Sequence, residues 1–399
     1  MKIKILITLL LFMVSATANA GAPARDPEFK TAAKSAFLID YDSGTEIVSK
    51  NADKLMPPSS MVKLMTLAVL FDEIKNGNLT LDSKLPVSEN ADYNNPLWYP
   101  ASKICLSAGQ EITVRDAILG LIVLSGGDAS VVVAEKLAGT ENAFTAKMQA
   151  KARSIGMEQS TFGNASGLPD PNNLMTSREL ATLATHIIGD YPDLYPMFAT
   201  KRFEFNDYKS DWCHDWGRTH TVNYNKLLFT MAGADGLKTG HTSDGGYGMV
   251  ASARVGGRRL VGVINGFNAR GHDALAAEMK KLMNFGYTNT TNKVFYRPGD
   301  TVVEIPVWYG RTKTVHATVE KPFAITLPKS VPSSTVRVLA RFNDPAPAPI
   351  AVGDKLGEII AERDGKIIAR APLVANERVR RVQFIKRIIK NIAVIFGGR

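Results

Sequence analysis

A serine and a lysine spaced three residues apart are the first residues of this chain that could do chemistry. Ser60 and Lys63 stand in segment 58–66, which begins with proline and continues as an apolar run to Phe71. Proline followed by serine predicts a helix start, and residues three apart on a helix share a face. A lysine whose pKa is lowered can take the proton of a serine hydroxyl and make it a nucleophile. Ser59 is a rival nucleophile, but the spacing to the lysine favours Ser60.

Alone, this Ser-x-x-Lys pattern is weak evidence, because a solvated lysine near a helix start explains it equally well. Two later patterns change the interpretation. Ser125-Gly126-Gly127 follows an apolar run with helical spacing, and Lys238-Thr239-Gly240-His241 precedes a predicted hairpin. In this order the three patterns resemble the S-x-x-K, S-D-N and K-T-G set of penicillin-binding proteins and class A β-lactamases.

When the residues that flank these three motifs are included, the chain resembles D-alanyl-D-alanine carboxypeptidases of the low-molecular-mass penicillin-binding class. The resemblance covers essentially the whole chain after residue 20 and includes the word Gly-Leu-Pro-Asp-Pro at 167–171. It implies that Ser60 attacks the carbonyl between two D-alanines and forms an acyl-enzyme, with Lys63 as its base. Ser125 would relay protons and contact the lysine. The implied substrates are peptidoglycan stem peptides, and β-lactams would be covalent inhibitors.

The third pattern is implied to bind substrate. Lys238 would supply positive charge on the far side of the cleft, and Thr239 and Gly240 would hold the terminal carboxylate end. The backbone N–H groups of the nucleophile and of His241 would form an oxyanion hole, which stabilises charge that develops in the transition state. Two lysines near one serine would also make each other harder to protonate, which keeps one of them usable as a base.

One position departs from the family pattern. Gly127 stands where the family usually has an asparagine, whose amide contacts the lysine and the substrate backbone. Losing one such polar contact weakens binding by roughly 1–3 kcal/mol, which is about ten- to a hundred-fold in rate. Asn164 or Asp128 are candidates to replace the amide. The sequence therefore predicts reduced rather than absent turnover.

The predicted fold of residues 21–290 is α/β (α+β), with an antiparallel sheet and a helical cluster, and it resembles the β-lactamase/transpeptidase fold. Strands at 35–41 and 45–49 precede the helices, and a hairpin at 247–264 follows them, so the sheet is completed late in the sequence. Further helices are predicted at 114–124, 128–137, 141–155, 177–188 and 274–285.

Two segments follow this domain. Residues 291–376 contain only short strand-like runs between turns, which indicates a small all-β sandwich without chemistry of its own. Residues 377–399 form an apolar stripe with basic residues opposite, which predicts an amphipathic helix lying on an anionic membrane surface. Docking on the protein body or self-association is the alternative. The stripe comprises Val382, Ile385, Ile388, Ile389, Ile392, Ile395 and Phe396.

The first 20 residues are predicted to be a secretory signal peptide. Two lysines precede an apolar run at 5–14 and an Ala-x-Ala cleavage site at 18–20. The run is too short to span a bilayer, although retention as an anchor is an alternative. The mature chain would be exported and would lie peripherally on the periplasmic face of the inner membrane.

The net charge of +10 is unevenly distributed. Lys2 and Lys4 contribute +2 and residues 377–399 contribute +6, which leaves +2 for the rest of the chain. The basic character therefore belongs to the ends, and a nucleic-acid partner is not indicated.

Neither a metal nor another cofactor is predicted, because the six histidines are scattered and no HExxH or CxxC motif occurs. Cys105 and Cys213 are the two cysteines. Export permits a disulfide, but two cysteines do not define a framework. Their state is left open, with two thiols as the working assumption.

Two other functions are weighed against the carboxypeptidase. A β-lactamase needs a carboxylate for deacylation, typically in a Glu-x-x-Leu-Asn motif. The loop at 162–177 does not contain this motif. A peptidoglycan-binding or scaffold protein that acylates slowly is supported by Gly127 and opposed by the intact serine and lysines. The sequence therefore favours a membrane-associated serine D-Ala-D-Ala carboxypeptidase.

Overall fold

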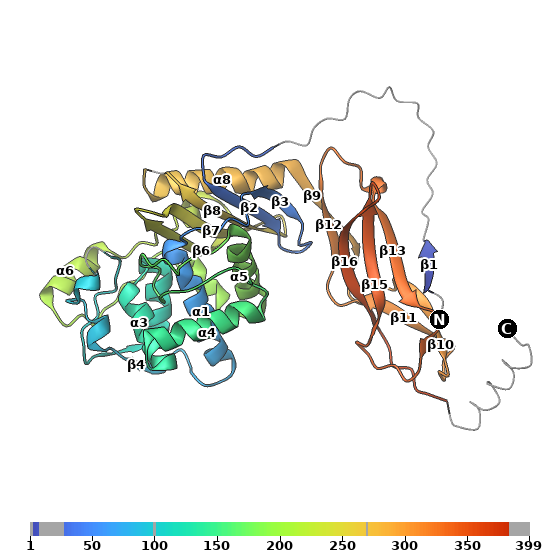
Figure 1. Ribbon diagram of the computed structural model, residues 1–399, viewed down its shortest axis with the longest axis horizontal. Helices are drawn as coiled ribbons and strands as arrows, with labels where there is room; N and C mark the ends of the chain where they lie inside the picture. Colours follow the sequence, from blue (N-terminus) through green and yellow to red (C-terminus); the bar gives the residue numbers. More distant parts are fainter. Residues whose placement is uncertain (1–2, 8–27, 99–100, 269, 383–399) are drawn as a thin grey trace, which may run out of the picture. The chain divides into compact units, whose positions relative to one another are not determined.

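The computed structural model describes residues 3–7, 28–98, 101–268 and 270–382. The chain divides into two compact units (Figure 1). The larger unit comprises Glu28–Tyr41 and Glu46–Thr288. The smaller unit comprises Met1–Pro27, Asp42–Thr45 and Asn289–Arg399.

A five-stranded antiparallel sheet forms the framework of the larger unit, in the order β3-β2-β8-β7-β6. The predicted N-terminal pair and the late hairpin are both confirmed. The hairpin turns at Gly256 and Gly257, whose positive φ angles of 59° and 81° suit glycine. The strand that carries the Lys-Thr-Gly pattern was not assigned from the sequence, and it forms the sheet edge. The strands are β2 (Ser35–Asp40), β3 (Glu46–Lys50), β6 (Ala234–Thr242), β7 (Gly246–Val255) and β8 (Arg258–Phe267).

Both faces of this sheet are covered by helices (Figure 1). Because side chains alternate across a strand, Leu38 and Leu260 pack in one core with residues of α8 (His272–Asn289). Phe37 and Val261 belong to the other core, which also contains the buried face of α1 (Lys63–Lys75). The sheet therefore separates the body of α8 from the helical cluster that carries Ser60, Lys63 and Ser125.

The predicted helices of the cluster are present with local differences at two places, and α6 and α7 were not predicted. Ser59–Val62 form a 3-10 turn before α1, so Ser60 precedes the α-helix rather than starting it. Gly120–Leu124 form a π-helical turn after α2. Thr113, Thr140 and Thr176 accept backbone N–H groups at the starts of α2, α4 and α5, as N-caps do. The remaining helices are α2 (Val114–Leu119), α3 (Gly127–Ala138), α4 (Glu141–Ser154), α5 (Ser177–Asp190), α6 (Asp211–Thr219) and α7 (Leu227–Thr230).

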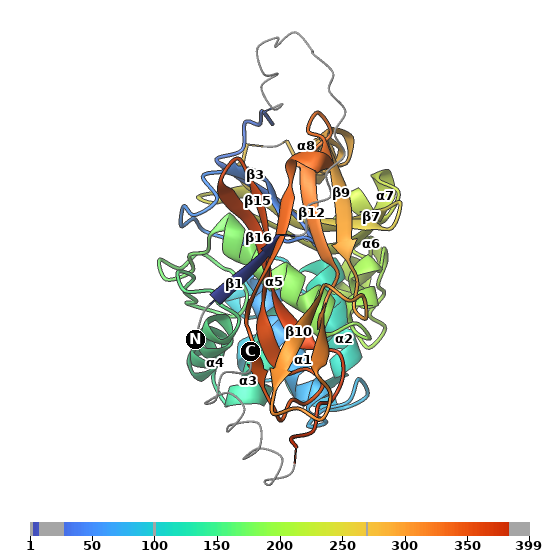
Figure 2. The same cartoon turned by 90° about the vertical axis from the view of Figure 1, so that its right-hand side faces the viewer.

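The smaller unit is all-β, as predicted (Figure 2). A seven-stranded sheet has the order β1-β13-β15-β16-β11-β10-β14, and β9 pairs with β12 in a second sheet. Ile305, Phe323 and Ile359 are buried in its core. The strands are β1 (Ile3–Ile7), β9 (Thr290–Tyr296), β10 (Val303–Trp308), β11 (Thr314–Val319), β12 (Phe323–Pro328), β13 (Arg337–Asn343), β14 (Ala346–Pro347), β15 (Lys355–Arg363) and β16 (Lys366–Ala375).

The two ends of the chain bear on the predicted signal peptide and tail helix. Residues excluded from the fold as part of a signal peptide form β1, which pairs with β13 at the sheet edge in the full-length chain. Of the amphipathic helix predicted over 377–399, residues 383–399 lie outside the described part of the chain; residues 377–382 are described and are not helical, because Val379 and Arg381 form β-bridges with Ile350 and Gly310. Within the described part, no helix has the length and apolar character needed to cross a membrane.

Candidate active site

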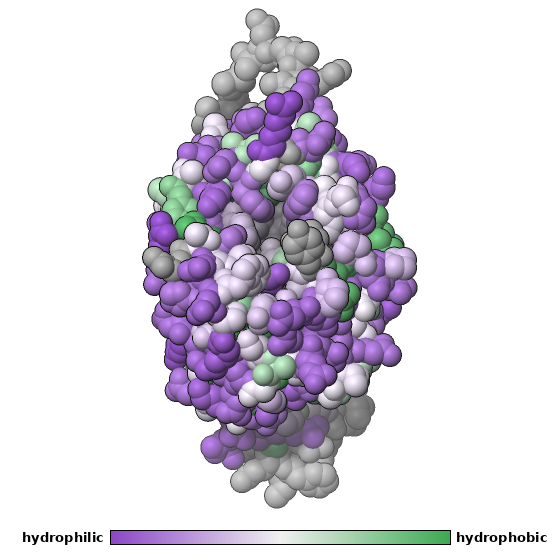
Figure 3. Space-filling model, turned by 90° about the vertical axis from the view of Figure 1, so that its left-hand side faces the viewer, coloured by the Kyte–Doolittle hydropathy of each residue, from purple (hydrophilic) through white to green (hydrophobic). Residues whose placement is uncertain are grey.

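A pocket of about 550 Å³ brings the three sequence patterns together. Ser60 and Lys63 line it, together with Ser125 and Gly127 and with residues of β6. A hollow is visible on the face of the molecule in Figure 3, where most surrounding side chains are hydrophilic. The remaining lining residues are Leu97, Trp98, Ala101, Ser102, Ser166, Gly167, Leu168, Pro169, Tyr224, Thr239, Gly240, His241, Thr242, Ser243 and His272.

The serine and the lysine of the first pattern are in contact. Lys63 Nζ lies 3.1 Å from Ser60 Oγ and donates a second hydrogen bond, of 2.5 Å, to the carbonyl oxygen of Ser166. The lysine is only 2% exposed. The 3-10 turn places these side chains together as the predicted helix would have done.

Burial lowers the pKa of Lys63 and so makes this lysine better able to act as a base. Desolvation lowers the pKa of Lys63 to about 7, although the negative charges of Asp128 and Glu141 oppose the shift. Burial is the leading cause of the lowered pKa of both lysines; the charge of Lys63 lowers the pKa of Lys238 further, whereas the pKa shift of Lys63 is attributed to burial, Asp128 and Glu141 and not to Lys238. Near neutral pH a substantial fraction of Lys63 is therefore uncharged and able to accept a proton.

Ser59, the rival nucleophile, has another role in the structure. Its backbone adopts a φ of 51°, in the left-handed region that non-glycine residues rarely enter. Its hydroxyl lies 2.7 Å from the hydroxyl of Thr242, at the end of β6. Ser59 therefore fastens the nucleophile turn to the edge strand, and its hydroxyl is engaged away from the lysine.

Two glycines permit the close packing around this turn. A Cβ on Gly240 would lie 2.9 Å from the carbonyl oxygen of Pro58 and 3.0 Å from the backbone nitrogen of Ser60. A Cβ on Gly167 would lie 2.1 Å from the carbonyl oxygen of Ser59. The third pattern and the 166–169 loop therefore approach the nucleophile more closely than any side chain would allow.

Asn164 shapes the loop that faces the lysine. Its Oδ1 accepts hydrogen bonds from the backbone N–H groups of Ser166 and Gly167, and its Nδ2 donates to the carbonyl of Leu168. These bonds hold the Ser166 carbonyl where Lys63 can donate to it. Asn164 is thus committed to the loop and does not replace the amide missing at Gly127.

Asp128 is not a replacement either. The buried carboxylate accepts backbone N–H groups of Ile104, Cys105, Leu106 and Ala129. Desolvation is the leading influence and raises the pKa of Asp128, while these four hydrogen bonds act against it. The side chain fixes the segment beside the cleft.

Ser125 lines the pocket but does not make the expected hydrogen bond. It adopts a left-handed conformation, with φ of 57°, between the π-helical turn and α3. Among the described residues, the partners of Lys63 Nζ are Ser60 and Ser166, and Ser125 is not one of them. The expected contact between Ser125 and Lys63 is therefore not made as a hydrogen bond in this structure, which corrects that part of the sequence prediction.

The predicted substrate-binding residues lie along β6. Lys238 is buried, and its Nζ donates to the carbonyl oxygen of Thr239. Burial, together with the charge of Lys63, lowers the pKa of Lys238 well below its usual value. The permanent positive charge that was expected on Lys238 is therefore disfavoured. A carboxylate bound beside the lysine would favour the charged form again. His241 is exposed, with its ring 4.0 Å from that of Tyr247.

A disulfide joins Cys105 to Cys213, so the assumption of two thiols was wrong. Their Cα atoms lie 5.6 Å apart although 108 residues separate them in sequence. The bond fastens α6, an unpredicted helix, to the segment beside the cleft. Trp212 adds to this attachment by stacking on Tyr93 and by receiving the Lys103 amine over its ring.

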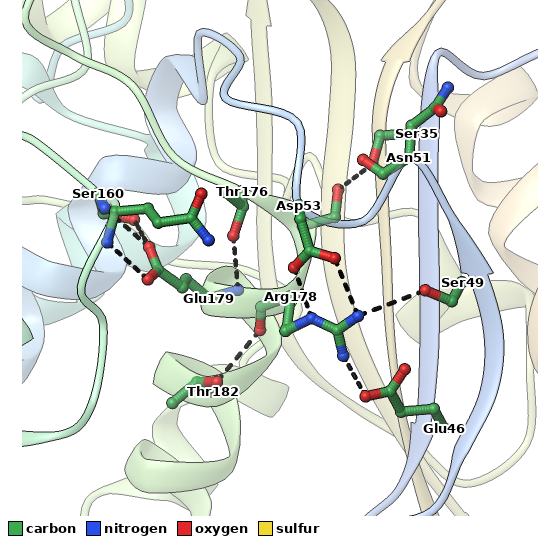
Figure 4. A network of polar contacts seen from close by, with 12 residues as sticks. Ser35, Glu46, Ser49, Asn51, Asp53, Ser160, Thr176, Arg178, Glu179 and Thr182 are labelled. Carbon is green, nitrogen blue, oxygen red and sulfur yellow. Dashed lines mark hydrogen bonds and ion pairs between the residues drawn. The ribbon is translucent and has the colours of Figure 1, made fainter.

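A polar network holds the chain that leads into the nucleophile turn (Figure 4). Arg178, in the first turn of α5, donates to both carboxylate oxygens of Asp53 and pairs with Glu46 on β3. A few residues later, Met56 and Met175 form backbone hydrogen bonds in both directions. These contacts place the nucleophile turn and the 166–169 loop side by side.

Sequence reasoning missed two further pocket residues, Tyr224 and His272. Their rings stack with centroids 5.0 Å apart. Burial, reinforced by Lys238 and other nearby cationic groups, lowers the pKa of His272 to about 4, so this imidazole is neutral at neutral pH. Neither residue stands in a recognisable motif, so the sequence offered no signal for them. No group of His, Cys, Asp and Glu within the described ranges could hold a metal ion.

Comparison with known proteins gives two family matches. Residues 19–269 match the model described as D-alanyl-D-alanine carboxypeptidase. Residues 291–381 match the penicillin-binding protein 5 C-terminal domain.

Individual relatives match over nearly their whole lengths. The D-alanyl-D-alanine carboxypeptidase DacF of Bacillus subtilis is 30% identical over 388 residues, which cover 95% of this chain and 94% of the relative. DacC of Escherichia coli is 29% identical and is covered to 92%. The crystal structure of penicillin-binding protein 5 from Haemophilus influenzae superimposes with a TM-score of 0.78 at 30% identity, and covers 89% of this chain and 99% of its own.

Proposed function

The chain belongs to the D-alanyl-D-alanine carboxypeptidase family of serine hydrolases, and we propose that it removes the terminal D-alanine of peptidoglycan stem peptides through an acyl-enzyme on Ser60. The observation that carries this proposal is the contact of a buried Lys63 amine, with a pKa of about 7, with the Ser60 hydroxyl.

Each step has a group to perform it. Neutral Lys63 accepts the Ser60 proton as Oγ bonds to the carbonyl carbon between the two D-alanines. The backbone N–H groups of Ser60 and His241 stabilise the oxyanion. The C–N bond then breaks, the proton passes to the leaving amine with Ser125 as a relay, and free D-alanine departs. Water hydrolyses the ester and regenerates the hydroxyl.

The other half of the site receives the substrate terminus. Thr239 donates to the terminal carboxylate, and Gly240 keeps the strand close to the nucleophile. Binding of this anion beside Lys238 raises the lysine's pKa, so a positive charge develops only when substrate is present. A β-lactam follows the same first step and leaves a longer-lived ester.

Release of D-alanine from a synthetic stem peptide ending in D-Ala-D-Ala tests the proposal, with Ser60→Ala as the control. Release that disappears in the variant supports the assignment. A weakened, peptidoglycan-binding scaffold is the second candidate, and Gly127, with no side chain, is the observation in its favour. A penicillin adduct on the wild type without any D-alanine release would favour that scaffold.

The proposed location is the periplasmic face of the inner membrane, reached through the 1–20 signal peptide. Residues 377–399 would bind anionic lipid through their basic residues. Flotation of the full chain with vesicles containing anionic lipid tests this. Vesicle binding should be lost in a variant with Lys386, Arg387 and Lys390 changed to Glu. If that variant binds the vesicles as well as the wild type does, the membrane assignment is contradicted.

A further inference from the structure

The space beside Gly127 is already filled. A Cβ built on this glycine would lie 2.5 Å from Cζ3 and 3.0 Å from Cε3 of Trp98, and 3.3 Å from the carbonyl oxygen of Ser102. Real Cβ atoms do not approach other atoms this closely. The glycine and the tryptophan ring are therefore fitted to each other, and an asparagine at 127 has no room.

Trp98 cannot easily move away. The residue is 2% exposed, and its Nε1 donates to the carbonyl of Asn90, at 3.1 Å. Its backbone N–H donates to Asn95, and its carbonyl accepts from the Lys103 amine. The polar atom of the indole is thus used on the protein side, and only hydrocarbon edge lies against Gly127.

Two neighbouring pocket residues on this wall are apolar, beside the polar Ser102. Leu97 and Ala101 line the same pocket. Leu97 is 63% exposed, which is unusual for a large aliphatic side chain. Apolar surface held open at the edge of a cleft gains stability when a ligand covers it.

We propose that Leu97 and Ala101, supported by Trp98, form an apolar subsite that selects substrates and inhibitors by an aliphatic or aromatic group on the acyl chain. This inference rests on the proposed function, in which Thr239 takes the leaving D-alanine and the acyl chain is left to meet the opposite wall. The subsite replaces recognition by a side-chain amide, because Gly127 has none and Trp98 leaves no space for one.

The test compares acylation of Ser60 by two β-lactams. One is benzylpenicillin, with a phenylacetyl side chain, and the other is 6-aminopenicillanic acid, with a free amine there. The ratio of their second-order rate constants should fall roughly tenfold in Leu97→Ser. Val255→Ser is the matched control, because Val255 is also exposed (42%) but lies at the β7 hairpin end and not in the pocket.

A second set of variants tests the fitted pair. Gly127→Asn should slow acylation by both compounds, because the new side chain displaces Trp98. In the double variant Gly127→Asn, Trp98→Ala, acylation should be faster than in Gly127→Asn alone. The ratio of the rate constants for the two β-lactams should remain below that of the wild type, because the support of the subsite is missing. Circular dichroism of each variant checks that it is folded.

The outcomes separate the two proposals. A wild type that neither β-lactam acylates would overturn the proposed function and the subsite with it. Normal acylation with the same ratio in the wild type and in Leu97→Ser would overturn the subsite alone. Full acylation by Gly127→Asn would show that the ring does not exclude a side chain at that position.

Discussion

The amine of Lys63 lies 3.1 Å from the hydroxyl of Ser60, inside protein that leaves the lysine 2% exposed. The same burial that brings the two groups together lowers the lysine's pKa to about 7. Position and basicity of this residue thus have one physical cause, which is its enclosure by the nucleophile turn and the Ser166 loop.

The first prediction concerns pH. Only uncharged Lys63 can accept the Ser60 proton, so the acylation rate should rise with pH and level off above a midpoint near 7. Stopped-flow acylation by a fluorescent penicillin between pH 5 and 9 measures the profile. A rate that is flat across this range would exclude Lys63 as the base.

Replacing Asp128 should affect both stability and the pH profile. Asp128→Asn removes the charge that accepts four backbone N–H groups, and unfolding should become easier by about 3 kcal/mol. The Asp128 charge also raises the pKa of Lys63, so the acylation midpoint should move to lower pH. Chemical denaturation and the pH profile measure the two effects. Exposed Asp82→Asn is the control, and a midpoint that moves upward would contradict this assignment.

The hydroxyl pair that fastens the nucleophile turn to β6 can be tested by a double-mutant cycle. Ser59→Ala and Thr242→Val each remove one partner of the 2.7 Å contact. Each should lower stability by about 1 kcal/mol and slow acylation several-fold. The double variant should be little worse than either single one. Fully additive effects would mean that the two hydroxyls act independently.

Reduction of the disulfide should loosen the wall of the cleft. Opening the Cys105–Cys213 bond frees a loop of 108 residues, and the free energy of unfolding should fall by about 2–4 kcal/mol. Acylation should slow as well, because the bond anchors the segment that carries Trp98. Denaturation and acylation of the wild type with and without dithiothreitol measure this, with the Cys105→Ala, Cys213→Ala double variant as the control for direct effects of the reductant. Equal stability in both states would refute the anchoring role.

Much of the fold was accessible from the sequence because its signals are local. The sequence predicted the strands β2, β7 and β8 and the helices α3, α4 and α5 within a few residues of their observed bounds. The α6 helix, which is only nine residues long and carries several polar residues, and β6, whose glycines and polar residues hide its strand character, were missed.

The sequence by itself determined which residues carry the chemistry, because the spacing of Ser60 and Lys63 and the order of the three patterns are properties of the chain alone. The tertiary structure decided which groups contact these residues and what environment surrounds them. The Ser166 carbonyl on Lys63, the cysteine pairing and the Trp98 ring over Gly127 each join segments distant in sequence. The pKa of a buried group likewise depends on what surrounds it in space, and neighbours along the chain do not reveal that environment.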